Sequence, residues 1–376
     1  MPASIDIATP RPASLGGQLI RELKLDGPML ALLLGIASVG LVVLYSAVNG
    51  DQGLILRQLI RLAAAFTALL LVAQIPPRYL RIWTPWIFLT GLLLLGLVLV
   101  TGDLGKGAQR WLDLGIVRFQ PSEILKLAVP MMVAWFLHAR PLPPNLRVLG
   151  VLVLITLTPT ILIAFQPDLG TALLVLAAGA VTIIVAGLSL RVMLAVGIVG
   201  LGAIPILWNF MLDYQRRRVI TFLNPETDPL GAGYNIIQSK IAIGSGGLFG
   251  KGWMNGTQAH LEFLPERSTD FIFAVMGEEF GLLGLLLLLG LYLAVVGRGL
   301  FIALQAQDTF SRLLAGSISL TFFVYVFVNA GMVCGLLPVV GVPLPLVSAG
   351  GTSMVTLMAG FGMLTAIAND RKLLAQ

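Results

Sequence analysis

The sequence predicts an all-α polytopic membrane protein with about ten transmembrane helices. Its 376 residues are 57% hydrophobic and only 11% charged, whereas soluble domains carry about 25% charged residues. Apolar runs close to the ~20 residues that cross a bilayer recur along the chain, for example Met29 to Val48 and Phe271 to Val296. These runs are leucine-rich and do not alternate apolar with polar residues. We therefore expect helices rather than barrel strands to pair their backbone N–H and C=O groups.

The apolar runs divide the chain into an N-terminal tail (1–27), a ten-helix membrane domain (28–370) and a C-terminal tail (371–376). The first run is too long for the core of a cleaved signal peptide and shows no clear processing site, so we expect a retained helix. The expected helices span 29–48, 56–75, 84–101, 122–139, 148–165, 169–187, 190–208, 270–298, 312–337 and 347–368.

An even number of spans places both termini on the same side of the membrane. The terminal side carries more basic than acidic residues, whereas on the opposite side the two kinds are nearly balanced. The positive-inside rule weights short loops and largely ignores long ones such as 209–269. With that segment set aside, both termini are expected in the cytoplasm.

The segment 209–269 is expected to form a large, partly structured extracytoplasmic loop between the seventh and eighth helices. Loops of this length are usually functional or disordered, and the aromatic residues Tyr214, Phe222 and Phe263 favour a folded cap. Its cations are candidates for binding a lipid headgroup, a partner or a diphosphate, and nucleic acid is not expected on this side. The candidates are Arg216, Arg217, Arg218, Lys240 and Lys251.

Metal and nucleotide motifs are weak or missing in the sequence. The glycine-rich stretch Gly244 to Gly252 lacks the Ser or Thr that follows Gly-Lys in a Walker A loop, and no strand is expected before it. It predicts at most a weak anion cradle with Lys251. A single cysteine, Cys334, provides no disulfide framework, and the two histidines are too far apart in sequence to predict a metal site.

The first candidate site lies where the fourth helix begins. Pro121 suits the first turn of a helix, which places Glu123 and Lys126 three residues apart on one face. Charges at membrane depth are functional candidates by default, so we expect this pair to face a partner or a cavity. The alternative is an internal ion pair that only fixes helix packing. Arg110 lies in the preceding loop, 102–121.

The second candidate site lies between the fifth and sixth helices. Pro167 breaks the chain there, and Asp168 falls where a helix N-cap is expected. Asp168 has two interpretations at this point: it only caps the helix, or its carboxylate has a function.

The third candidate site lies at the start of the eighth helix. Ser268 or Thr269 is expected to cap it, which would put Asp270 in the first turn, near the positive end of the helix dipole. On a helical wheel Gly277 falls close to Asp270, so the aspartate would approach a ligand over a smooth face, with Glu278 as the same-side acid. The alternative is again a cap with interhelical hydrogen bonds.

Several long motifs resemble the bacterial shape, elongation, division and sporulation (SEDS) family, over nearly the whole chain from Leu30 to Arg371. They include Lys106-Gly-Ala-Gln-Arg-Trp-Leu-Asp113 and Phe263-Leu-Pro-Glu-Arg-Ser-Thr-Asp-Phe-Ile272, which resemble the elongation branch more than the division and sporulation branches. The family usually has Pro-Leu-Val-Ser-Tyr-Gly-Gly-Ser before the last helix, where this chain has Ala349 and Thr352.

The resemblance implies a peptidoglycan glycosyltransferase that polymerises lipid II into β-1,4 glycan strands during cell elongation and releases undecaprenyl diphosphate. It would act on the outer face of the bacterial cytoplasmic (inner) membrane. The family's essential aspartate matches Asp270, its functional Glu and Lys match Glu123 and Lys126, and its Gln-Pro-Asp acid matches Asp168. The implied partners are a class B penicillin-binding protein, which supplies transpeptidation, and the MreB-linked elongation complex.

Glycosyl transfer to a sugar hydroxyl needs a base and positive charge to stabilise the departing diphosphate. We expect Asp270 to be the base, and Lys126 and Arg110, with one or more of the loop cations, to hold the donor diphosphate. A divalent cation, Mg²⁺ or Mn²⁺, that bridges the diphosphate to carboxylates is a further expectation, because hard cations prefer oxygen ligands. The sequence identifies no metal site.

Two other functions suit the same charges. A lipid II flippase or similar transporter also needs buried charges and proline-broken helices, but it needs a site reachable from both sides, and these sites cluster on the non-cytoplasmic side. A scaffold would use the charges only to recruit partners. An assay of purified protein with labelled lipid II distinguishes the three functions, because it measures glycan polymer and movement of lipid II across the bilayer.

Overall fold

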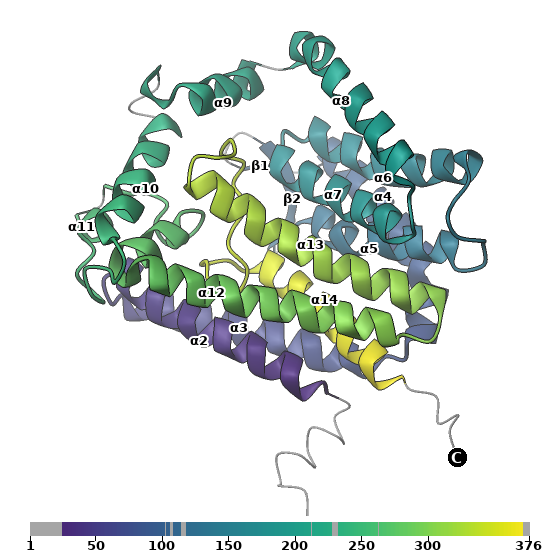
Figure 1. Ribbon diagram of the computed structural model, residues 1–376, viewed down its shortest axis with the longest axis horizontal. Helices are drawn as coiled ribbons and strands as arrows, with labels where there is room; N and C mark the ends of the chain where they lie inside the picture. The colour runs from purple at the N-terminus through teal and green to yellow at the C-terminus, as the bar shows by residue number, and fades with distance from the viewer. Residues whose placement is uncertain are drawn as a thin grey trace, which may run out of the picture.

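The computed structural model describes residues 25–101, 103–105, 108–113, 118–211, 213–227, 232–261 and 263–370. Within them, ten helices correspond to the ten expected ones and confirm the all-α multi-pass architecture (Figure 1). Most of the two expected tails lies outside the described residues. The ten helices are α2 (Gly27–Ala47), α3 (Gln52–Ala73), α4 (Pro77–Thr101), α5 (Pro121–Leu137), α6 (Leu146–Phe165), α7 (Leu169–Val185), α8 (Leu190–Phe210), α12 (Ile272–Gln305), α13 (Thr309–Val333) and α14 (Thr352–Asn369).

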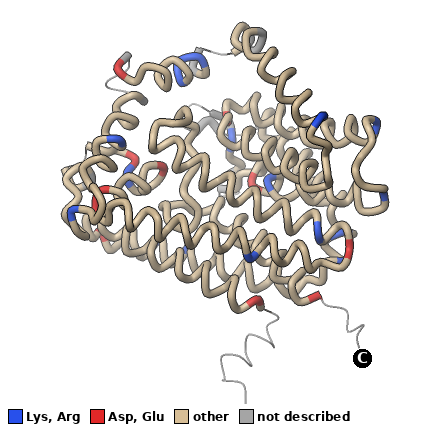
Figure 2. Tube along the Cα trace, in the orientation of Figure 1, with Lys and Arg blue, Asp and Glu red and all other residues tan. Residues whose placement is uncertain are grey.

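Hydropathy and exposure both suit a membrane environment. Seven described helices are long and apolar enough to cross a bilayer, and Leu169–Val185 (α7) and Leu190–Pro205 (within α8) are shorter apolar stretches. Large apolar side chains such as Leu71, Trp86 and Val100 are exposed on the outside of the bundle, where lipid chains would cover them. Charged residues gather mainly at the helix ends and in the connections (Figure 2).

The start of α2 and the end of α14 lie at the same end of the bundle, as expected from an even number of spans (Figure 1). Asp26 caps α2 by accepting a hydrogen bond from the backbone N–H of Met29 at 2.9 Å. The same carboxylate pairs with Arg298 of α12, with a shortest N–O distance of 2.5 Å. This pair fixes the start of the first described helix against a later one.

The last two helices differ from the expected boundaries. α13 ends at Val333 and α14 begins only at Thr352, so 334–351 is an irregular segment where helix was partly expected. The composition of this segment is apolar, but Pro338, Pro343 and Pro345 remove backbone donors. The segment folds back among the helices and supplies part of the functional site.

The expected cap is partly helical in the described residues, with α9 (Asp213–Leu223), a 3-10 turn (Pro225–Thr227), α10 (Ala232–Gly246) and α11 (Thr257–His260). α8 and α9 arch away from the bundle (Figure 1), whereas the end of α10 packs on the first turns of α12. A Cβ on Gly246 would lie 2.0 Å from the Gly277 carbonyl oxygen. The expectation that Gly277 smooths a ligand-facing surface is therefore wrong, because that face of α12 packs on α10.

A small antiparallel sheet joins α4 to α5, which an all-α prediction did not include. Strands β1 (Asp103–Gly105), β2 (Ala108–Asp113) and β3 (Arg118–Phe119) pair in the order β1-β2-β3. The central strand β2 carries Arg110 and Trp111 to the mouth of the cavity described next.

Candidate functional site

A cavity of about 230 Å³ opens where the beginnings of α5, α7 and α14 meet the irregular segment 334–351. The N-termini of these helices point positive dipole ends toward one region, which favours a bound anion. α14 has no side-chain cap, and its N-cap residue is Gly351. The lining includes Arg110, Trp111, Gln120, Glu123, Lys126, Asp168, Gly170, Thr171, Tyr325, Gly341, Gly350 and Gly351.

The beginning of α5 supplies an ion pair, as expected. Pro121 occupies the first turn, and the Lys126 Nζ lies 2.7 Å from the Glu123 Oε1. Lys126 is 8% exposed and Glu123 4% exposed, and the Lys126 ammonium lies 5.8 Å from the centre of the Tyr325 ring. The second carboxylate oxygen of Glu123 is buried without a hydrogen-bond partner. The pair faces the cavity rather than lipid.

Asp168 both caps α7 and lines the cavity, so the two alternatives for this residue are compatible. Its Oδ1 accepts a hydrogen bond from the Thr171 backbone N–H at 3.3 Å. Its Oδ2 accepts one from the Gln120 side chain at 3.0 Å and lies 3.8 Å from the Arg110 Nε. Arg110 also donates to the carbonyl of Pro167. These contacts hold a guanidinium beside the cavity.

Asp270 lies in the turn that precedes α12, not in its first helical turn. The helix begins at Ile272 after Phe271, without a side-chain cap, so the expectation that Ser268 or Thr269 caps it is wrong. Instead, Thr269 bonds to Glu266 at 2.6 Å. A Cβ placed on Gly341 would lie 3.5 Å from the Asp270 Oδ2. Because Gly341 lines the cavity, the Asp270 carboxylate lies beside one of the lining residues.

Asn329 is a site residue that the sequence analysis missed. It is fully buried on α13, and its side-chain amide donates to the Asp270 carbonyl at 2.9 Å and to the Val342 carbonyl at 2.7 Å. It therefore joins the turn that carries Asp270 to the segment that lines the cavity. A lone asparagine within an apolar helix was the available signal.

The irregular segment is also fastened to the Asp270 turn. The Ser348 hydroxyl donates to the Thr269 carbonyl at 2.5 Å, and the Ala349 N–H donates to the Ser268 carbonyl at 2.7 Å. The side chain at position 349 is not needed for this bond, which is consistent with Ala replacing the family's usual Tyr.

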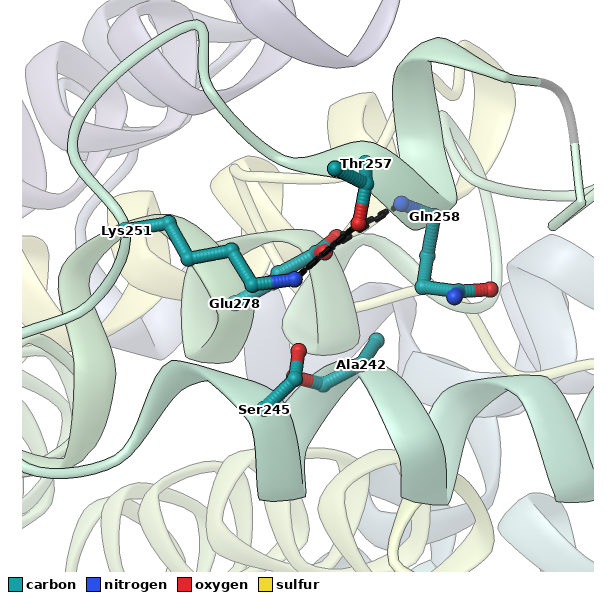
Figure 3. A network of polar contacts seen from close by, with 6 residues as sticks. All are labelled: Ala242, Ser245, Lys251, Thr257, Gln258 and Glu278. Atoms are coloured by element: carbon teal, nitrogen blue, oxygen red, sulfur yellow. Dashed lines mark hydrogen bonds and ion pairs between the residues drawn. The ribbon is translucent and has the colours of Figure 1, made fainter.

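Lys251 belongs to a different cluster (Figure 3). Its Nζ lies 2.7 Å from the Oε1 of Glu278, which is fully buried and also accepts from the Thr257 hydroxyl at 3.0 Å and the Gln258 N–H. The backbone N–H groups of Lys251 and Gly252 donate to carbonyls of α12. The Lys251 ammonium and these N–H groups therefore already have partners within the protein, which argues against the weak anion cradle expected here.

The remaining loop cations also lie away from the cavity lining. Arg216 donates to the carbonyls of Trp208 and Asn209 and so ties α9 to the end of α8. Arg217 is exposed, and Arg218 lies on the same helix. Lys240 is exposed on α10 beside Gly335. The structure thus brings Arg110, Glu123, Lys126 and Asp168 to one cavity and places Asp270 beside its lining residue Gly341. It does not bring these loop cations to the cavity lining.

The described residues contain no group of three or more His, Cys, Asp or Glu side chains arranged to hold a metal ion. Within the cavity, two cations, Arg110 and Lys126, face two carboxylates, Glu123 and Asp168. Side-chain charges therefore balance, and the helix N-termini leave a positive bias toward an anion.

The fold and the site define a class: a multi-pass helical membrane protein with a charged cavity built from helix N-termini. A family model of FtsW, RodA and SpoVE cell cycle proteins matches residues 28–373. The chain belongs to this family.

The chain is similar to individual members over most of its length. It is 53% identical over 357 residues to the peptidoglycan glycosyltransferase MrdB of Escherichia coli K12, covering 94% of this chain and 96% of that protein. It also resembles a chain solved in a study of how a peptidoglycan synthase complex coordinates polymerization and crosslinking, with a TM-score of 0.80, 36% identity, and coverage of 93% of this chain and 99% of that one. The rod shape determining protein RodA of Thermus thermophilus is 32% identical, with a TM-score of 0.70 and coverage of 92% and 97%.

Proposed function

We propose that this protein is a peptidoglycan glycosyltransferase that polymerises lipid II into β-1,4 glycan strands during cell elongation and releases undecaprenyl diphosphate. One observation carries the chemistry: the carboxylate of Asp270 lies beside Gly341, which lines a cavity that contains Lys126, Arg110 and three helix N-termini. The strong similarity to MrdB supports the same reaction.

The cavity suits the diphosphate of the donor lipid. Negative charge grows on this group as the glycosidic carbon–oxygen bond breaks, and fixed positive groups stabilise it best in a site that excludes water. Lys126 and Arg110 supply cations held in place by Glu123 and Asp168. Gly350 and Gly351 let the backbone of α14 approach the anion closely.

Asp270 suits the role of general base. It removes the proton from the 4-hydroxyl of the acceptor sugar while that oxygen attacks C1 of the donor sugar. Single displacement of an α-linked diphosphate gives the β bond. Asn329 holds the backbone of this residue and thereby orients the base.

A divalent cation, Mg²⁺ or Mn²⁺, is part of the proposal. Such ions need only one or two protein carboxylates when phosphates supply other ligands, and the unpartnered oxygen of Glu123 together with Asp168 fits that requirement. When bound, the ion would neutralise charge on the departing diphosphate. Polymerisation is expected to fall with EDTA and to recover with added Mg²⁺ or Mn²⁺; full activity in EDTA would contradict this part.

We also propose that the protein lies in the bacterial inner membrane with both termini in the cytoplasm and the cavity facing the outer leaflet. Its partners would be a class B penicillin-binding protein and the MreB-linked elongation complex. The similarity to a chain of a peptidoglycan synthase complex supports a crosslinking partner.

In the deciding experiment, the purified protein is reconstituted in liposomes that contain labelled lipid II, with and without the partner penicillin-binding protein. Glycan chains that form in the wild type, persist with moenomycin and vanish in Asp270→Asn would support the proposal. Movement of lipid II across the bilayer without polymer would instead support a flippase. An Asp270→Asn variant as active as the wild type would remove the base from the mechanism.

A further inference from the structure

The cavity beside Asp270 is too small for everything the proposed reaction needs. Its volume of about 230 Å³ is below the ~300–1,000 Å³ typical of pockets that hold drug-sized ligands. A donor diphosphate and sugar already have to fit there. The acceptor sugar, whose hydroxyl must reach Asp270, therefore needs a separate place.

A second hollow, of about 500 Å³, lies against the turn that carries Asp270. One wall comes from the connection between α2 and α3 and includes Asn49, Asp51 and Leu54. The other wall comes from the turn itself and includes Pro265, Arg267 and Ser268. We call it the acceptor hollow.

The turn that carries Asp270 lies next to lining residues of both spaces. Ser268 lines the acceptor hollow and lies two residues before Asp270, so their Cα atoms are at most ~7 Å apart. The Asp270 carboxylate itself stands beside Gly341 of the cavity. A sugar held in the acceptor hollow would therefore lie close to the turn that carries the base.

Hydrogen bonds fix the two walls of the acceptor hollow to each other. The Arg267 Nε donates to the Ala47 carbonyl at 2.7 Å, which ties the turn to the end of α2. Asp51 caps α3 by accepting from the N–H groups of Gly53 and Leu54 at 2.8 and 3.1 Å. The hollow is consequently preformed, which lowers the entropic cost of ligand binding.

The chemistry of the lining matches a saccharide better than an anion. One carboxylate and one guanidinium balance each other, and an amide and a hydroxyl add neutral polar groups. Leu54 and Pro265 offer apolar contacts for the carbon–hydrogen face of a sugar ring. A few polar groups among apolar ones are typical of sites that orient a neutral polar ligand.

We propose that the acceptor hollow binds the N-acetylglucosamine end of the acceptor lipid II. This assignment rests on the proposed polymerase function. Asp270 takes the proton of the acceptor 4-hydroxyl, the oxygen forms a bond to C1 of the donor sugar, and the C1–oxygen bond to the diphosphate breaks. Undecaprenyl diphosphate departs with the bonding electron pair, and no other reactant is needed.

The test fills the acceptor hollow without touching the cavity. Leu54→Trp and the smaller Leu54→Phe reduce its volume, and Leu56→Trp is the matched control. Leu56 is 59% exposed and is not among the lining residues, and it lies about 200° around α3 from Leu54. The donor is labelled lipid II whose N-acetylglucosamine 4-hydroxyl is replaced by hydrogen, so that it cannot serve as an acceptor. The concentration of unmodified lipid II, the acceptor, is varied.

We expect the acceptor KM to rise in the order Leu, Phe, Trp, reaching at least about tenfold for Leu54→Trp. Binding of undecaprenyl diphosphate, which reports the cavity and correct folding, should stay at the wild-type value, as should all values for Leu56→Trp. An unchanged acceptor KM in both Leu54 variants, or an equal rise in the donor KM, would overturn the assignment. A wild type that makes no product would instead count against the proposed function itself.

Discussion

At the residue scale, the site depends on charges that hold one another in place. Burying either the Glu123 or the Lys126 charge alone at membrane depth costs free energy. Their ion pair at 2.7 Å offsets much of that desolvation cost. Arg110 and Asp168 repeat this arrangement across the cavity at a longer distance of 3.8 Å. Each carboxylate thus positions a cation that the proposed chemistry uses.

The ion pair allows stability and activity to be separated. Lys126→Met should destabilise the protein by roughly 3–5 kcal/mol, because it leaves a buried carboxylate unpaired, and should abolish polymerisation. Adding Glu123→Gln should recover most of the stability but none of the activity. The measurements are thermal unfolding in detergent and polymer formation from lipid II. An active double variant would show that Lys126 serves only packing.

Asn329 gives a second test at this scale. Asn329→Leu should lower kcat on the order of 10–100-fold, because a small shift of a general base away from the proton that it removes strongly slows the reaction. Undecaprenyl diphosphate binding should remain, since the amide bonds backbone carbonyls rather than the cavity cations. Rate measurements at saturating lipid II check the prediction. A change confined to KM would mean that Asn329 does not position the base.

At the element scale, the close contact between α10 and α12 decides how the cap sits on the membrane domain. Gly246→Ala should destabilise the protein by about 1–3 kcal/mol, because the added carbon would lie 2.0 Å from the Gly277 carbonyl oxygen. Gly244→Ala is the matched control on the same helix, since nothing lies within 4 Å of its added carbon. Thermal unfolding and limited proteolysis of the cap measure the effect. Equal stability of the two variants would contradict this packing.

At the scale of the whole molecule, the proposed orientation puts the cavity in the outer leaflet. Single cysteines are introduced in a Cys334→Ala background at Leu248, beyond α10, and at Leu146, at the start of α6; the two side chains are 61% and 75% exposed. Cys334 forms no disulfide and is only partly buried, so its removal is expected to be nearly neutral. A membrane-impermeant maleimide should label Leu248→Cys in intact cells and Leu146→Cys only after permeabilisation. The reverse pattern would invert the topology.

Hydropathy alone predicted the ten helices, because a chain in lipid must bury its backbone polar groups within continuous apolar helices. Residue spacing and the positions of Pro121 and Pro167 also predicted the Glu123–Lys126 pair and the Asp168 cap, since both depend on spacings of three residues within a single element. These features are local, and no tertiary contact is needed to find them.

Only the tertiary structure decided which charged residues meet. Lys251 and Lys126 are both lysines near glycines or acids in the sequence, yet one pairs with Glu278 under the cap and the other lines the cavity. Likewise, both ends of the irregular segment 334–351 were expected to be helical, and its bonds to the Asp270 turn join residues about 80 positions apart. The physical reason is that long-range packing sets these contacts, whereas the sequence pattern specifies each element's own periodicity and ends.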